Sequence, residues 1–261
     1  MRGGCGRRGT GVAEERSAIS DLGEYVLLLQ RALVAAFVSP PKRALVLDQL
    51  YEIGVRSLSI VNLTAIFTGM VMTLQLGYFL SKFGAKIFVS RILGIAIISE
   101  LGPVLTALMI GGRVGAGMAA ELGTMKVTEQ IDALRAMGAD PISYLVVPRL
   151  VAIIVMMPLL TGMANLIGVL GGMLIAQVEL GVQPAFYTQS LLQFLTLGDL
   201  ARSLTKASIF AAIIGGVACV NGLNATGGAD GVGRATTRTV VAAAVSVLVS
   251  DFFLTRLMLA L

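Results

Sequence analysis

The sequence predicts an all-α integral membrane protein with about five membrane-spanning helices. Of its 261 residues, 56% are apolar and only 13% are charged, and the mean hydropathy is +0.87. Soluble domains are typically about 45–50% apolar. Five apolar runs are each long enough to cross the membrane, because roughly 20 helical residues span about 30 Å of hydrocarbon.

The first 57 residues precede these runs and divide into two parts. Residues 1–17 form a basic tail that we expect to be disordered, and residues 18–57 hold an amphipathic helix and a connector. One face of that helix is apolar, and Pro40 and Pro41 then end the pattern. The residues on this face are Ile19, Leu22, Tyr25, Val26, Leu29 and Leu33. The pattern predicts a helix lying on the inner membrane surface, and a helix packed on the spans is the alternative.

The remaining residues, 58–261, form the predicted transmembrane domain. Its expected spans are 58–80, 87–110, 142–180, 203–220 and 240–261. The third run is too long for one straight crossing, since about 39 residues reach roughly 58 Å as a helix. Pro158 and Asn165 could divide it, but its glycines equally suit one long, closely packed helix. We expect one span that extends beyond the bilayer.

A short amphipathic helix is predicted at about 122–138, between the second and third spans. It is too short and too charged to cross the membrane. Its narrow apolar stripe consists of Val127, Ile131 and Leu134, and its other faces carry Glu129, Asp132 and Arg135. Such a helix could be held by a soluble partner, and packing on its own chain is the alternative.

Positive charges predict how the spans are oriented. Lys and Arg are most frequent before the first span, between the second and third spans, and before the last span. Because such residues favour the cytoplasmic side, these regions and the N-terminus are expected to be cytoplasmic. Lys82 and Lys86, between the first two spans, are exceptions.

Several kinds of site are excluded by composition. The chain has no histidine, and its two cysteines are Cys5 in the tail and Cys219 in an apolar run. A zinc site, a disulfide framework and a Ser-His protease are therefore not expected. The glycine-rich string that begins at Gly111 lacks the Gly-Lys-Ser/Thr of a phosphate loop, so the chain is expected to bind neither ATP nor another cofactor.

Charged residues inside the apolar runs are the first candidates for a functional site. Three of them are Glu100 in the second span, Lys206 at the start of the fourth and Asp251 in the fifth. Each costs roughly 2.5–3.5 kcal/mol at the centre of a membrane helix, so such groups usually face a cavity or one another. Glu100 could pair with Lys206 or Arg91. Asp251 could pair with Lys206 or Arg256.

One long block, from Glu100 to Pro141, carries a family resemblance. Together with Asn221 and Gly222, and with the string GVGRATTRTVV from Gly231, it resembles the MlaE/YrbE family of permeases. The resemblance extends from about Asp48 to the C-terminus. Members of this family are the membrane subunits of ABC transporters that work with MCE proteins in lipid trafficking. Some members place a basic residue before the glutamate, whereas this chain has Ser99. Lys206 or Arg91 would then have to neutralise Glu100, or Glu100 could be protonated in its apolar setting.

The resemblance implies a set of partners rather than an enzyme. Two permease chains would form a homodimer in a bacterial inner membrane, with a cytoplasmic ABC ATPase dimer that binds ATP and magnesium. A hexamer of MCE domains would lie on the periplasmic side, and a small STAS-type regulator is a further partner that the resemblance allows. No nucleic acid is expected. The helix at 122–138 would be the coupling helix that docks into the ATPase.

The resemblance also implies a lipid cavity at the dimer interface, with phospholipids as the expected substrates. Its lining would include Phe79, Leu80 and Phe83, with Glu100 nearby. Lys82, Lys86 or Lys206 could meet a phosphate. The alternative function is that of a self-sufficient, ion-coupled secondary transporter or channel, which would use Glu100 and Asp251 as its ion sites.

Overall fold

The computed structural model describes residues 43–260 without a gap, and eight positions closer to the N-terminus. Those eight are Gly23, Tyr25, Leu27, Leu28, Gln30, Arg31, Ala32 and Ala35, all of them helical. The tail 1–17 and the rest of the predicted N-terminal helix lie outside the described residues. The described chain consists of helices and connecting turns, with no strand, which confirms the predicted fold class.

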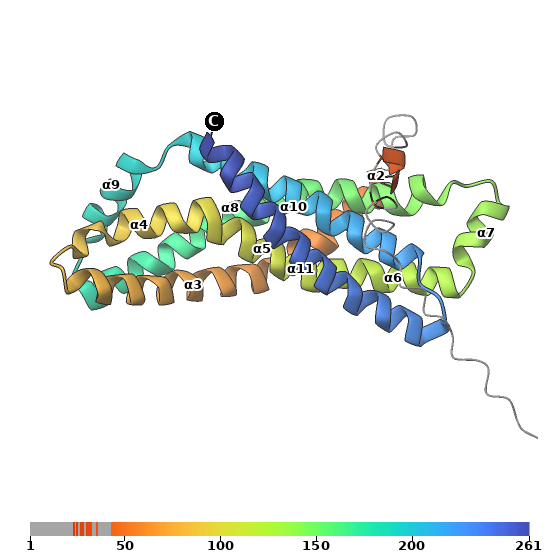
Figure 1. Cartoon of the computed structure of the whole chain (residues 1–261), viewed down its shortest axis with the longest axis horizontal. Helices are drawn as coiled ribbons and strands as arrows, with labels where there is room; N and C mark the ends of the chain where they lie inside the picture. The colour runs from red at the N-terminus through yellow and green to blue at the C-terminus, as the bar shows by residue number, and fades with distance from the viewer. Residues whose placement is uncertain are drawn as a thin grey trace, which may run out of the picture.

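Five helical rods form a bundle along the long axis of the molecule (Figure 1). They comprise α2 and α3 (Arg43–Leu50, Arg56–Ser81), α4 to α6 (Val89–Ala96, Gly102–Ile110, Ala116–Val127), α8 (Val147–Leu180), α10 (Leu197–Leu223) and α11 (Gly228–Ala260). All five are long and apolar enough to cross a membrane, so the predicted number of spans is confirmed. The connector before the first span is also helical, because α2 packs on α8 and continues into α3 through a π-helical turn.

The second rod stays helical through the glycine-rich string that begins at Gly111. Residues Gly111–Gly115 form a π-helical turn between α5 and α6, and Ile97–Leu101 form another between α4 and α5. The rod therefore runs over 42 residues, from Lys86 to Val127. At 1.5 Å per residue this is roughly 63 Å, about twice the hydrocarbon thickness, so the rod extends well beyond a bilayer.

The third rod is one helix, as expected, and the alternative division at Pro158 or Asn165 is wrong. α8 continues through Pro158 and ends at Leu180. Its glycines bring its backbone against α3. A Cβ placed on Gly69 of α3 would lie 1.9 Å from the carbonyl oxygen of Gly168, and one on Gly171 would lie 2.6 Å from that of Ile66. Small residues at these positions let the two helices touch along their backbones.

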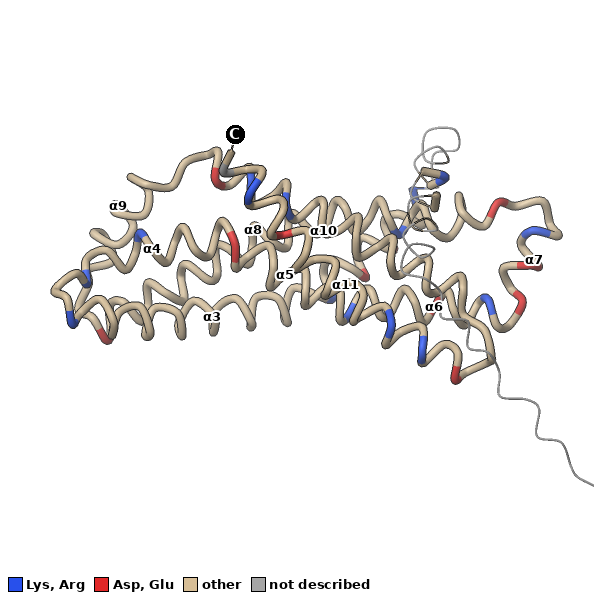
Figure 2. The backbone as a smooth tube through the Cα atoms, in the orientation of Figure 1, with Lys and Arg blue, Asp and Glu red and all other residues tan. Residues whose placement is uncertain are grey.

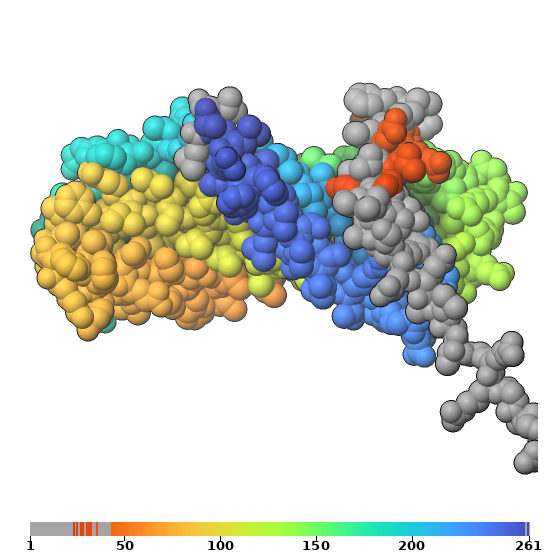
Figure 3. All heavy atoms as spheres, in the orientation of Figure 1, coloured from red at the N-terminus to blue at the C-terminus, as the bar shows by residue number. Residues whose placement is uncertain are grey.

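The fourth rod, α10, is the centre of the bundle. It contacts α5, α6, α8 and α11. Of the 18 residues in its most apolar stretch, 61% are buried, whereas only 11% are buried in the corresponding stretch of α11. α11 is therefore peripheral. In the space-filling view α11 crosses one face of the molecule obliquely (Figure 3). The large apolar side chains exposed on α3 and α11 are available to lipid or to another chain.

Two short helices lie at opposite ends of the bundle. α7 (Gln130–Ala136) projects at one end, and α9 (Pro184–Phe194) lies at the other. Many of the charged residues gather at the α7 end (Figure 2). The described positions of the N-terminal helix pack on the spans: the hydroxyl of Tyr25 donates to the carbonyl of Ala212 in the middle of α10, at 3.2 Å, and Ala32 lies in an apolar cluster with Leu122 and Ile131. These contacts favour the alternative that the N-terminal helix packs on the spans.

The close approach of α3 and α8 generates a testable prediction. Gly69→Ala places a methyl group against the Gly168 backbone, so we expect the thermal midpoint in detergent to fall, with a cost of about 1–3 kcal/mol. Gly162→Ala in α8 is the matched control, because the nearest atom to its Cβ, on Leu204, lies 4.0 Å away. Equal midpoints for the two variants would contradict the proposed backbone contact.

Candidate functional site: a polar cluster between the spans

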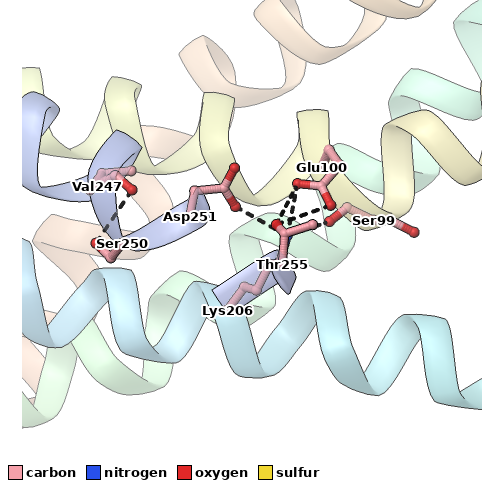
Figure 4. Close-up of polar contacts among 7 residues, drawn as sticks. All are labelled: Ser99, Glu100, Lys206, Val247, Ser250, Asp251 and Thr255. Carbon is pink, nitrogen blue, oxygen red and sulfur yellow. Dashed lines mark hydrogen bonds and ion pairs between the residues drawn. The ribbon is translucent and has the colours of Figure 1, made fainter. Parts of the chain in front are cut away.

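Four polar side chains from separate parts of the chain meet inside the bundle (Figure 4). Glu100 comes from the π-helical turn between α4 and α5, Lys206 from α10, and Asp251 and Thr255 from α11. The ammonium of Lys206 lies 2.8 Å from Oε2 of Glu100, 3.1 Å from Oδ1 of Asp251 and 2.7 Å from Oγ1 of Thr255. We call these four residues the polar cluster.

Lys206 is the centre of the polar cluster. Its side chain is only 3% exposed. An ammonium has three N–H donors, and Lys206 has four acceptors within reach, the fourth being the carbonyl oxygen of Ser99 at 3.2 Å. Its donors are therefore all engaged by its own chain. The expectation that Lys206 could meet a phosphate is wrong for this conformation.

Pro103 explains why the carbonyl of Ser99 is open to Lys206. In an α-helix this carbonyl would accept a bond from the N–H four residues later, and proline has none. A buried carbonyl without a partner is costly. The ammonium of Lys206 donates to this carbonyl at 3.2 Å, so an acceptor to which Pro103 cannot donate is used by the lysine.

Gly102 brings a second polar contact close to the polar cluster. A Cβ on Gly102 would lie 1.7 Å from Oδ1 of Asn165, so only glycine leaves room for this amide. The Nδ2 of Asn165 donates to Oγ of Ser203 at 3.0 Å, one turn before Lys206. This contact ties α8 to α10, and it fixes the part of α10 from which the lysine projects.

The charges of the polar cluster are unequal, because one ammonium faces two carboxylates. The side chains of Glu100 and Asp251 are 41% and 20% exposed, so both reach the molecular surface. A charged group in a membrane span faces a water-filled cavity or another protein rather than acyl chains. Among the described residues there is no group of three or more His, Cys, Asp or Glu side chains that could hold a metal ion.

The structure decides between the predicted ion pairs. Both Glu100 and Asp251 pair with Lys206, which confirms one of the two options given for each. Arg91, the other candidate for Glu100, lies over the ring of Phe194, with its guanidinium carbon 3.1 Å from the ring centroid. Lys86 donates to the carbonyl of Leu180 at 3.3 Å, at the α9 end of the bundle.

The other predicted cavity residues lie apart from Glu100. Phe79 and Phe83 form an aromatic pair, with ring centroids 5.2 Å apart, where α3 ends. Phe79 and Phe83 are exposed and Leu80 is half-buried. Glu100 lies 11 residues beyond the start of α4, or roughly 16 Å further along the rod. Within one chain, the predicted cavity therefore consists of two separate parts.

The predicted helix at 122–138 is not continuous. α6 ends at Val127, and Glu129 adopts a left-handed conformation (φ 61°) before α7 begins. Ile131 is fully buried and Leu134 is half-buried, and both pack on a cluster of apolar residues that includes Leu122. The predicted apolar stripe is thus largely used within the chain, and the exposed faces of α7 are polar.

The polar face of α7 holds a small network of exposed charges. Asp132 accepts hydrogen bonds from Lys126 at 3.3 Å and from Arg135 at 3.0 Å. Met137, immediately after α7, is 74% exposed. The surface that α7 offers to a partner therefore consists of Glu129, Asp132, Arg135 and Met137.

Asp140 orders the start of the third rod. It accepts hydrogen bonds from the hydroxyl and the N–H of Ser143, at 2.7 and 3.2 Å, and from the N–H of Ile142, at 3.2 Å. Burial opposes its ionisation, but these bonds and the nearby charge of Arg135 outweigh burial and hold its pKa below 3.8. The carboxylate satisfies N–H groups that a helix start leaves without partners.

Sequence reasoning missed the uncharged members of this region. Thr255, Asn165, Ser203 and the carbonyl of Ser99 are ordinary residues on apolar helices, and their roles depend on neighbours that are distant in sequence. Two signals were available in the sequence. Thr255 lies four residues after Asp251, on the same helical face. Pro103 cannot donate a hydrogen bond to the carbonyl four residues before it.

Removal of the central cation should be costly. Lys206→Met leaves two carboxylates without the ammonium, so we expect a loss at the lower end of about 3–5 kcal/mol, since Glu100 can still be solvated. Thermal unfolding in detergent measures the change, and Lys86→Met is the control at an exposed lysine. Adding Glu100→Gln to Lys206→Met should recover part of the loss. A Lys206→Met protein as stable as the parent would contradict the role of the ion pairs.

The contribution of Asp140 should depend on pH. Asp140→Ala is expected to cost about 1 kcal/mol at neutral pH, through loss of the helix-start bonds. Because the folded-state pKa is lowered, this contribution is present above the ordinary value of 3.8 and is lost as pH falls through the lowered pKa. Thermal midpoints across this range measure it. Asp140→Asn keeps an acceptor that does not titrate, so its difference from Asp140→Ala should not vary with pH.

Comparisons with known proteins agree with this architecture. The family model of Permease MlaE matches residues 46–257. A protein of Rickettsia typhi named "Probable ABC transporter permease protein" is 41% identical over 226 residues, which are 86% of this chain and 87% of that protein. A protein of Synechocystis with the same description is 42% identical over 212 residues, 81% of each chain.

A plant protein is also similar. Protein TRIGALACTOSYLDIACYLGLYCEROL 1, chloroplastic, of Arabidopsis thaliana is 38% identical over 208 residues, which are 80% of this chain and 59% of that protein. The family match extends over all five rods and includes the polar cluster and α7. The chain therefore belongs to the MlaE permease family and is an ABC transporter permease that crosses the membrane several times.

Proposed function

We propose that this permease moves lipids, with phospholipids as the first candidates, between the inner membrane of a bacterium and periplasmic MCE proteins. The family supports a transport subunit rather than an enzyme. The Arabidopsis relative is named after trigalactosyldiacylglycerol, a glycosylated lipid. This name supports a lipid as the transported molecule. ATP and magnesium would bind to a separate ATPase.

The observation that carries the lipid proposal is a polar site on an apolar surface. Glu100 and Asp251 reach the surface, while Leu248 and Phe252, on the same stretch of α11, are 53% and 62% exposed. A site with apolar walls and a few placed polar groups suits a molecule that has both acyl chains and a polar headgroup. An ion-coupled transporter is less well supported, because the family and the similar proteins are ABC transporter permeases, which work with an ATPase.

A second copy of the chain would complete this site. The outer faces of α3 and α11 carry large exposed apolar side chains, and the partly exposed carboxylates need a polar or aqueous environment. A homodimer would enclose both features in one cavity. Phe79, Leu80 and Phe83 would then line its outer end, next to the MCE hexamer.

The ATPase would dock at the α7 end. ABC transporter permeases work with an ATPase, and α7 offers an exposed charged surface there. We propose that this end and the N-terminus are cytoplasmic, because most Lys and Arg residues of the loops belong to it. A STAS-type regulator would act on the same side.

The assembly is tested by affinity purification of the chain from its native membrane in mild detergent. Subunits are identified by mass spectrometry, and bound lipids are measured in the same sample. Recovery of an ABC ATPase, an MCE protein and phospholipid is the expected result. Recovery of the permease with neither protein and without lipid would overturn the proposal.

The docking surface gives a further prediction. Met137→Glu places a charge on an exposed apolar side chain in the proposed interface, so we expect the affinity for the ATPase to fall about ten-fold. The amount of ATPase that co-purifies measures the effect. Leu192→Glu, at a residue of α9 that is 71% exposed, is the matched control at the other end. Loss of ATPase only with Leu192→Glu would place the docking surface at the α9 end.

A further inference from the structure

The exposed part of the polar cluster consists of hydrogen-bond acceptors. The cation is almost completely buried, since the side chain of Lys206 is 3% exposed, whereas those of Glu100 and Asp251 are 41% and 20% exposed. A molecule that reaches the cluster from the surface therefore meets carboxylate oxygens before it meets the ammonium. This order of burial decides which chemical groups can bind.

The balance of donors and acceptors leads to the same conclusion. Two carboxylates together offer about eight lone-pair positions. Within the described residues they accept from two donors, the ammonium of Lys206 and the hydroxyl of Thr255, which lies 3.3 Å from both oxygens of Glu100. Acceptor positions therefore remain on both carboxylates, while the three N–H groups of Lys206 already have four acceptors within reach.

Neighbouring cations do not change this chemistry. Arg91 stacks on Phe194. Arg256 follows Thr255 in α11, but it projects about 100° away from Thr255 around the helix and about 140° away from Asp251. The exposed face of the polar cluster thus presents negative charge and free acceptors.

We propose that the polar cluster selects lipid headgroups that carry N–H donors, with a primary ammonium of the ethanolamine type as the best fit. This inference rests on the proposed lipid-transport function and specifies its substrate. A primary ammonium brings three donors and a positive charge to the two carboxylates, and such charge-assisted bonds are stronger than neutral ones. A quaternary ammonium of the choline type carries the same charge without an N–H group. A headgroup with only a phosphate presents acceptors to acceptors and is repelled.

The comparison of ethanolamine with choline isolates this effect, because the two headgroups differ in donors and not in net charge. The complete transporter, purified from its native membrane, is equilibrated with vesicles that contain equal amounts of phosphatidylethanolamine and phosphatidylcholine with identical acyl chains. The retained lipids are then quantified by mass spectrometry. We expect phosphatidylethanolamine to be enriched about ten-fold, because one additional hydrogen bond to a charged group changes an affinity by about that factor.

Two variants locate the preference in the polar cluster. Glu100→Gln and Asp251→Asn each replace a carboxylate by an amide of similar shape, and each should reduce the enrichment several-fold. Glu179→Gln, at an exposed carboxylate near the end of α8, is the matched control and should keep it. If one variant fails to assemble, the other and the parent protein still test the proposal.

The possible outcomes separate this inference from the proposed function. Equal retention of the two lipids by the parent protein would overturn headgroup selection and leave lipid transport standing. The same enrichment in both variants as in the parent would place the selection elsewhere and also overturn the inference. If the parent protein retained no phospholipid, the proposed function itself would fail.

Discussion

A single buried ammonium holds together three segments of this permease that are distant in sequence. Lys206 projects from the central helix α10 and joins the π-helical turn at Glu100 to α11 at Asp251 and Thr255. In a membrane, an uncompensated charge at this depth is too costly to persist, so the helices that carry its partners must stay close. Pro103 adds to this constraint, because the carbonyl of Ser99 that it leaves open also accepts from Lys206.

Glycine packing makes this arrangement possible. Gly69, Gly168 and Gly171 bring α3 and α8 into backbone contact, and Gly102 makes room for Asn165, which binds Ser203 on α10. α8 packs against both α3 and α10, so these close approaches also help to place α10, from which Lys206 projects. The apolar outer faces of α3 and α11 are left for lipid or a second chain.

The rod that carries Glu100 also ends next to α7. From Glu100 to Val127 the chain remains helical, a distance of roughly 40 Å at 1.5 Å per residue. Arg113 ties this rod to Ser57 at the start of α3, at 2.8 Å. If a bound ATPase displaced α7, the rod next to it, which contributes Glu100 to the polar cluster, would be the element through which the movement reached the cluster. The rod would then link ATP hydrolysis to the proposed lipid site.

The sequence by itself determined the fold class, the number of spans, the single third span and the three charges that pair, because hydrophobic length and the cost of isolated charges are local properties. It could not choose between Lys206 and Arg91 as the partner of Glu100, since that choice depends on how α10 packs. Only the tertiary structure showed that Ile131 is buried, that α6 and α7 are separate, and that Phe79 lies far from Glu100. Thr255 and Asn165 became members of the site for the same reason: uncharged groups acquire a role only from the neighbours that packing gives them.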